Sequence, residues 1–146
     1  MHKTAQQLAE AAAAAMYARD RASLALGMKL LGVGPGMASM QMAIREDMVN
    51  VHNTCHGGLI FTLADSTFAY ACNSHNRNAV AITCLIEYMR PAYVGDLLMA
   101  TGREQGLEGR NGVYDIRVEN QKGELVALFR GKSTQIKGDV TDLSKR

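Results

Sequence analysis

The sequence predicts an α+β fold in which one long buried helix packs against an antiparallel β-sheet. Residues 57–73 are apolar on almost every face at helical spacing and contain one charged residue, Asp65. The other segments mostly alternate apolar and polar residues between turns, without the strand–helix alternation of a parallel nucleotide-binding sheet. The length of 146 residues suits one domain with its own core.

The N-terminal part, residues 1–27, is expected to form an amphipathic helix over residues 4–24. Thr4 followed by Gln7 matches the capping-box pattern of a helix start, and Gly27 is a suitable stop. Alanines and larger apolar residues recur between them at helical spacing. The pattern leaves open whether this helix covers a site or only packs on the sheet.

Two strands are expected next. The first ends at the turn dipeptide Pro35-Gly36, and the second, over residues 38–45, alternates apolar and polar residues as a half-buried strand does. The glycines of residues 32–36 superficially resemble a phosphate-binding loop, but a strand and not a helix follows them, so we interpret them as a turn. A polar loop, residues 46–56, then leads to the buried helix.

Four further strands are expected after the buried helix, separated by turns rich in Gly, Asp and Asn. Residues 137–146 are polar and are expected to form a frayed tail. The chain is therefore predicted to be one domain spanning residues 1–146. The four strands are placed at about residues 79–90, 95–106, 112–120 and 124–136.

Composition excludes several classes of function. The chain has 16 Lys and Arg against 14 Asp and Glu, a net charge of +2, which gives no reason to expect a nucleic-acid or anionic-membrane partner. No stretch has the character of a signal peptide or a membrane span. The chain has an odd number of cysteines without paired spacing, namely Cys55, Cys72 and Cys84. We therefore expect no disulfide framework and a cytoplasmic location.

The stretch from His52 to Gly58 is the first candidate site. Two adjacent glycines at a helix start leave backbone N–H groups approachable at the positive end of the helix dipole, which suits a developing oxyanion or a phosphate. Alternatively, Gly57 and Gly58 only let the helix begin close to another backbone. His52 and His56 have the spacing of two metal ligands, but no glutamate follows His52 and the segment precedes the helix, so no metal site is expected.

Asp65 is the second candidate. A carboxylate on a buried apolar helix is costly unless it is paired or has a function. Such surroundings raise the pKa and make the group a better base or nucleophile at neutral pH. The alternative is a structural aspartate held by hydrogen bonds to a neighbouring loop.

The separation of the two candidates indicates how a site would be assembled. Gly57 and Asp65 are eight residues apart, which on a helix is about 12 Å. The two residues of one chain are therefore too far apart to contact the same small carbonyl group. A catalytic interpretation predicts a two-fold dimer in which the acid of one subunit faces the glycine N–H of the other.

Three stretches carry a family resemblance. They are HNTCHGGLIFTLADSTFAYACNS, LIEYMRPAYVGD and YDIRVENQKGELVALFRGKS. With them the chain resembles the hotdog-fold acyl-CoA thioesterases, in particular those of phenylacetic acid degradation, from about Met28 to Ile136. The HGG motif, the aspartate eight residues after its first glycine, and the Arg90-Pro91 step fall in the family's order.

The resemblance implies a long helix wrapped by an antiparallel sheet, in homodimers that often pair into homotetramers. It implies that the Gly57 amide polarises the thioester carbonyl and that Asp65 of the partner subunit is the nucleophile or general base. Asn50 would orient substrate or water, His56 would shape the loop, and Gly58 would contact substrate. No metal and no cofactor is implied, since coenzyme A is part of the substrate.

Two sets of residues have two interpretations each. Arg130 and Lys132 either bind the phosphates of coenzyme A or are solvated charges of an edge strand. Met37, Met40, Met42 and Met48 either fill the core or line an adaptable acyl pocket.

The resemblance predicts a thioesterase that hydrolyses aryl-acetyl or related acyl-CoA esters, linked to phenylacetate degradation. Two alternatives keep the fold. One is a module that binds acyl-CoA without turnover, although a binder has no need of Asp65. The other is a dehydratase, which would pair a helix acid with a histidine, and His56 is the only close candidate.

Overall fold

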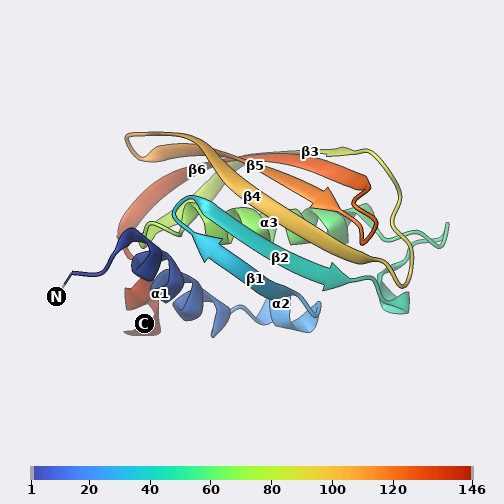
Figure 1. Cartoon of the computed structure of the whole chain (residues 1–146), viewed down its shortest axis with the longest axis horizontal. Helices are drawn as coiled ribbons and strands as arrows, with labels where there is room; N and C mark the ends of the chain where they lie inside the picture. The colour runs from blue at the N-terminus through green and yellow to red at the C-terminus, as the bar shows by residue number, and fades with distance from the viewer. Residues whose placement is uncertain (1, 146) are drawn as a thin grey trace.

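The computed structural model describes residues 2–145. Within them, six strands form one sheet in the order β1-β2-β4-β5-β6-β3, with every neighbouring pair antiparallel. Figure 1 shows the sheet curling around helix α3 (Gly57–Cys72). This is the α+β layout predicted from the sequence. The strands are β1 (Lys29–Gly34), β2 (Met37–Ala43), β3 (Arg77–Tyr88), β4 (Leu97–Glu108), β5 (Asn111–Glu119) and β6 (Leu125–Asp139).

The N-terminal segment is two helices, so the prediction of one helix over residues 4–24 is wrong. The predicted capping box at Thr4 starts α1 (Ala5–Tyr17), which packs against β1. The carboxylate of Asp20 then accepts a hydrogen bond from the Ser23 amide and begins α2 (Arg21–Ala25). An aspartate favours such a cap over a helix interior, which explains the break.

The C-terminal segment is ordered, so the expected frayed tail is wrong for residues 137–145. Strand β6 continues to Asp139, paired with Arg77, and a 3₁₀ helix, η2 (Val140–Lys145), packs against α1. Val140 is fully buried, and the Thr141 amide donates to Asn76. The burial of Val140 and the hydrogen bond between Thr141 and Asn76 thus anchor a segment whose composition is typical of a loose end.

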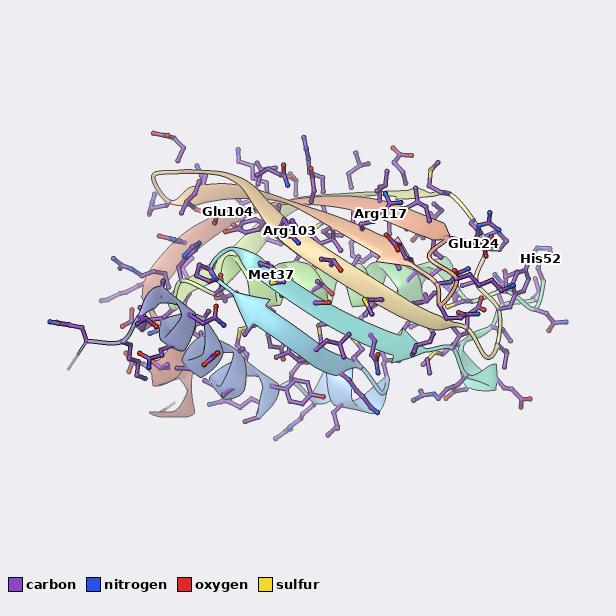
Figure 2. All side chains as sticks on the ribbon, viewed as in Figure 1. Met37, His52, Arg103, Glu104, Arg117 and Glu124 are labelled. Atoms are coloured by element: carbon purple, nitrogen blue, oxygen red, sulfur yellow. The ribbon has the colours of Figure 1, made fainter. Side chains whose placement is uncertain are left out.

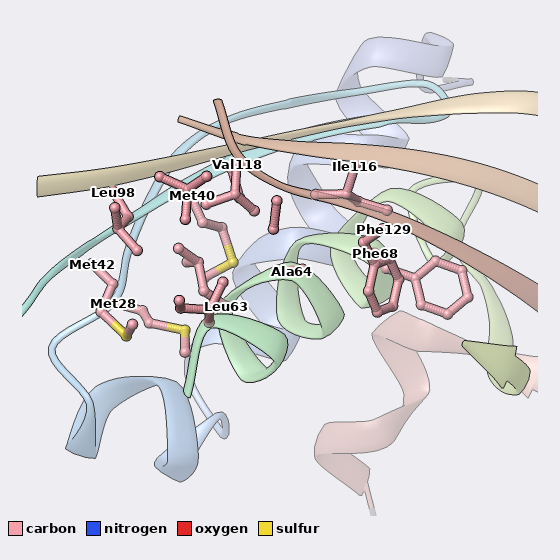
Figure 3. Packing of buried hydrophobic residues seen from close by; sticks show 14 of the residues in the cluster. Met28, Met40, Met42, Leu63, Ala64, Phe68, Leu98, Ile116, Val118 and Phe129 are labelled. Carbon is pink, nitrogen blue, oxygen red and sulfur yellow. The ribbon is translucent and has the colours of Figure 1, made fainter. Parts of the chain in front are cut away.

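The core lies between α3 and the inner face of the sheet. Leu63, Ala64 and Phe68 of α3 meet residues of β2, β4, β5 and β6 (Figure 3). Met40, Met42 and Met48 are also fully buried here, so they fill the core. Another 3₁₀ helix, η1 (Glu46–Met48), leads into the loop before α3. No helix within residues 2–145 is long and apolar enough to cross a membrane.

Gly131 of β6 sets a limit on this packing. A Cβ atom there would lie 2.7 Å from the ring of Phe68, and neighbouring rings of Tyr114 and Phe129 hold that ring in place. We expect Gly131→Ala to lower the free energy of unfolding by about 1–3 kcal/mol, because the overpacked ring has nowhere to move. Gly32→Ala is the control, since nothing lies within 4 Å of its Cβ position. Equal denaturant midpoints for the two variants would contradict this.

Candidate active site

The start of α3 presents one open backbone amide. His56 is the N-cap residue, and its Nδ1 accepts a hydrogen bond from the Gly58 amide at 3.1 Å. No acceptor within residues 2–145 takes the Gly57 amide. Of the two glycine N–H groups expected to face a ligand, the structure therefore leaves Gly57 open, while the Gly58 N–H is already bonded to the imidazole.

A hollow of about 340 Å³ opens beside Gly57. Tyr88 lies against the glycine, and its hydroxyl donates to the Gly57 carbonyl oxygen at 2.7 Å. Burial raises the pKa of the Cys55 thiol to about 11, so this thiol is protonated at neutral pH and a poor nucleophile. The hollow is lined by Cys55, Gly57, Ile60, Tyr88, Met89, Arg90 and Pro91.

Arg90 brings a positive charge to this hollow. Its guanidinium forms an ion pair with Glu124 at 3.0 Å, with both side chains partly exposed. Glu124 and His52 lie at the end of the molecule where α3 begins (Figure 2). The sequence marks Arg90 through the Arg90-Pro91 step, and the structure adds its place in the lining of this hollow.

Asp65 lies two turns further along α3 and is half-buried. Burial raises the pKa of its carboxyl above the ordinary value, and a hydrogen bond from the Cys84 thiol, with sulfur and oxygen 3.8 Å apart, offsets part of that rise. None of the ion pairs formed within residues 2–145 includes Asp65. The carboxyl therefore has the surroundings of a base or nucleophile and not of a structural ion pair.

Gly57 and Asp65 are not brought to one point within the chain. Both belong to the same continuous helix, which places them about 12 Å apart along its axis. Both also face β3, the strand at one edge of the sheet. The Gly57 amide and the Asp65 carboxylate thus lie along the same edge of the molecule.

Asn50 organises the loop before α3. Its side-chain oxygen accepts hydrogen bonds from the His52 amide and from the amide and hydroxyl of Thr54. Its side-chain NH₂ donates to no acceptor within residues 2–145 and is the group left to reach a ligand. Across the described part of the chain, no cluster of three or more His, Cys, Asp or Glu has the geometry to hold a metal ion.

The structure does not bring Arg130 and Lys132 to the hollow beside Gly57. Arg130 lies on the outward face of the sheet and forms two hydrogen bonds with Asp115, at 2.6 and 2.7 Å. Figure 2 shows Arg103 and Arg117 on the sheet, and both line a hollow that Arg130 also lines. Lys132 lies next to the turn between β4 and β5. A phosphate-binding role for Arg130 and Lys132 stays a prediction.

The fold and this edge of the molecule together define the class of protein. Residues 52–127 match the Thioesterase superfamily, and the chain belongs to it. It is a hotdog-fold enzyme that hydrolyses thioesters, which confirms the resemblance seen in the sequence.

Among particular relatives, the chain is 46% identical over 127 residues to acyl-coenzyme A thioesterase PaaI of Escherichia coli, covering 87% of this chain and 91% of that protein. The structure of the E. coli PaaI protein from the phenylacetic acid degradation operon superposes with a TM-score of 0.92 and 43% identity, covering 93% and 99% of the two chains. Human acyl-coenzyme A thioesterase 13 is 32% identical over 103 residues, 69% of this chain and 74% of that protein.

Proposed function

We propose that this enzyme hydrolyses acyl-CoA thioesters, aryl-acetyl-CoA esters foremost, to the free acid and coenzyme A. The observation that carries the proposal is the half-buried Asp65, which has no cationic partner among residues 2–145, on a helix that begins with the open Gly57 amide. The similarity to PaaI over most of the chain supports both the acyl-CoA substrate and a link to phenylacetate degradation. A cytoplasmic location fits such a substrate.

The chemistry needs two groups on opposite sides of the thioester. The Gly57 N–H, at the positive end of α3, donates to the carbonyl oxygen and stabilises the negative charge that develops there. Asp65 either attacks the carbonyl carbon or takes a proton from the attacking water. In both cases the carbon–sulfur bond breaks, and water supplies the oxygen of the acid and the proton of the leaving thiol. Direct attack forms an acyl–aspartate anhydride, which water then hydrolyses to free Asp65. Neither step calls for a metal or a further cofactor.

A second copy of the chain completes the site in this proposal. The sheet has two edges, and α1 packs against β1 at one of them. Strand β3 forms the other edge and exposes Val80, Ile82 and Leu85. Unpaired strand edges of this kind pair readily with a second chain. Pairing through β3 about a two-fold axis would set Asp65 of one subunit facing Gly57 of the other, in a homodimer or a homotetramer of two such pairs.

The remaining candidate residues have supporting roles in the proposal. His56 holds the Gly58 amide, which fixes the helix start and leaves Gly57 for the substrate. The free NH₂ of Asn50 orients the substrate or the water. The backbone around Gly58 contacts the coenzyme A part. A phosphate contact from Arg130 and Lys132, which lie outside the hollow beside Gly57, stays a prediction.

Thiol release from a panel of acyl-CoA esters tests the proposal. We expect turnover of phenylacetyl-CoA with a higher kcat/KM than that of straight-chain acyl-CoA esters, and coenzyme A and free acid in equal amounts. Tight binding of the esters without thiol release would instead indicate a sequestering module. Conversion of hydroxyacyl or enoyl esters without thiol release would indicate a dehydratase. Either result would overturn the proposed hydrolysis.

A further inference from the structure

Strand β3 runs alongside α3, on the side of the helix that carries the proposed reacting groups. Cys84 and Tyr88 are four residues apart on this strand, so their side chains share one face, about 13 Å apart. Gly57 and Asp65, eight residues apart on the helix, are about 12 Å apart. Because these spacings match, one face of β3 touches both groups at once.

Tyr88 fixes the start of the helix. Its hydroxyl donates to the Gly57 carbonyl at 2.7 Å, and its ring lies 3.2 Å from where a Cβ atom at Gly57 would be. Two successive glycines restrain a backbone weakly, so the first turn of α3 depends on outside contacts for its orientation. The tyrosine supplies such a contact on the carbonyl side of Gly57, and the N–H side is left for a ligand.

Cys84 makes the corresponding contact at the other group. Its thiol donates to the Asp65 carboxylate, with sulfur and oxygen 3.8 Å apart. No other side chain within residues 2–145 donates a hydrogen bond to Asp65. A single weak donor orients one carboxylate oxygen and leaves the other for substrate or water.

We propose that Tyr88 and Cys84 are positioning residues for hydrolysis, each acting through the reacting group that it contacts. The inference rests on the proposed function of Gly57 and Asp65. Since β3 is also the open edge of the sheet, the strand that would pair with a second copy is the strand that orients both reacting groups. The two residues of one β3 then act in two different sites of the dimer, the tyrosine in one and the cysteine in the other.

The effect of Cys84 on Asp65 has a definite sign. The titratable groups of the described residues that interact with Asp65 are Cys84 on β3 and Cys72 on its own helix. The hydrogen bond from Cys84 stabilises the carboxylate and lowers the pKa of Asp65. Without it the pKa rises further, and activity that needs the carboxylate is lost at a higher pH as the pH falls.

The test for Tyr88 compares two tyrosine variants. Tyr17 also donates its hydroxyl to a backbone carbonyl, that of Met28, at 2.9 Å, but far from α3's first turn. We expect Tyr88→Phe to lower kcat for phenylacetyl-CoA about tenfold with KM within about twofold, a fraction of the loss caused by deleting an oxyanion donor. Tyr17→Phe should leave kcat unchanged. Equal kcat values for the two variants would overturn the role of Tyr88.

The test for Cys84 is the pH profile of kcat/KM. We expect Cys84→Ala to move the acid limb to higher pH, and Cys84→Ser, which restores a donor, to move it back. An acid limb that is the same in Cys84→Ala and the wild type would overturn the role of the thiol. Asp65→Asn separates the two proposals, because activity retained in that variant would remove the catalytic role of Asp65 on which the role of Cys84 rests. Elution volume and thermal unfolding confirm that each variant keeps its assembly and fold.

Discussion

Asp65→Asn is expected to lower kcat for acyl-CoA hydrolysis by about 10²–10⁴-fold, the range for loss of a group that transfers a proton in the transition state. An amide has the size of the carboxylate but neither attacks a thioester nor accepts a proton from water. Because the side chain is only half-buried and its hydrogen-bond partner is a thiol, the helix should stay folded. The measurement is thiol release under saturating substrate.

Asp47→Asn is the matched control. Asp47 is exposed on η1 and pairs with Arg45, so the same change there should leave kcat unaltered. Wild-type turnover by Asp65→Asn would assign the carboxylate a structural role. The proposed site would then have no group to deliver the oxygen.

Asp65→Asn should also stabilise the folded protein at neutral pH. Burial raises the pKa of Asp65 in the folded state, so between the unfolded and folded pKa values the native state binds more protons than the unfolded state. Stability is therefore lost as the pH rises through that window. Asparagine has no charge to desolvate and escapes this loss. A higher Tm together with a lost activity is the combination expected of a group kept for chemistry and not for folding.

The fold was predictable because its signals are local. Residues 57–73 are apolar on almost every face, and only a helix enclosed by other elements tolerates that pattern. The break at Asp20 and the ordered tail were not predictable to the same degree. They depend on the Asp20 cap, which accepts a hydrogen bond from the Ser23 amide, and on the burial of Val140. Neither contact can be inferred from composition.

The candidate site was predictable in its residue types but not in its contacts. A lone carboxylate at Asp65 and two glycines at a helix start stand out in the sequence without any structure. The hydrogen bond from the Gly58 amide to the His56 imidazole could not be predicted from the sequence, because Ser, Thr, Asp and Asn are the usual N-cap residues. The contacts of Cys84 and Tyr88 require the alignment of β3 against α3, which sequence spacing alone does not specify.

The proposed sharing of the site between two subunits predicts how mixed dimers behave. A heterodimer with Asp65→Asn in one chain and Gly57→Val in the other retains one site with both native groups if each site takes its amide and its acid from different chains. Gly57→Val alone should be inactive, because its side chain would enter the hollow beside the open amide and also displace Tyr88, which lies 3.2 Å from the Cβ position.

We expect dimers purified through two different tags, one on each chain, to show about half the wild-type rate, since one of two equivalent sites is intact. The reciprocal control joins a wild-type chain to a chain carrying both substitutions. With shared sites this dimer has no intact site and is inactive, whereas a site formed within one chain would leave it about half active and the first heterodimer inactive. The two heterodimers contain the same substitutions in the same number, so differences in folding or expression cannot reverse which of them is more active. The ranking of their two rates therefore decides whether the acid acts on its own subunit or across the dimer.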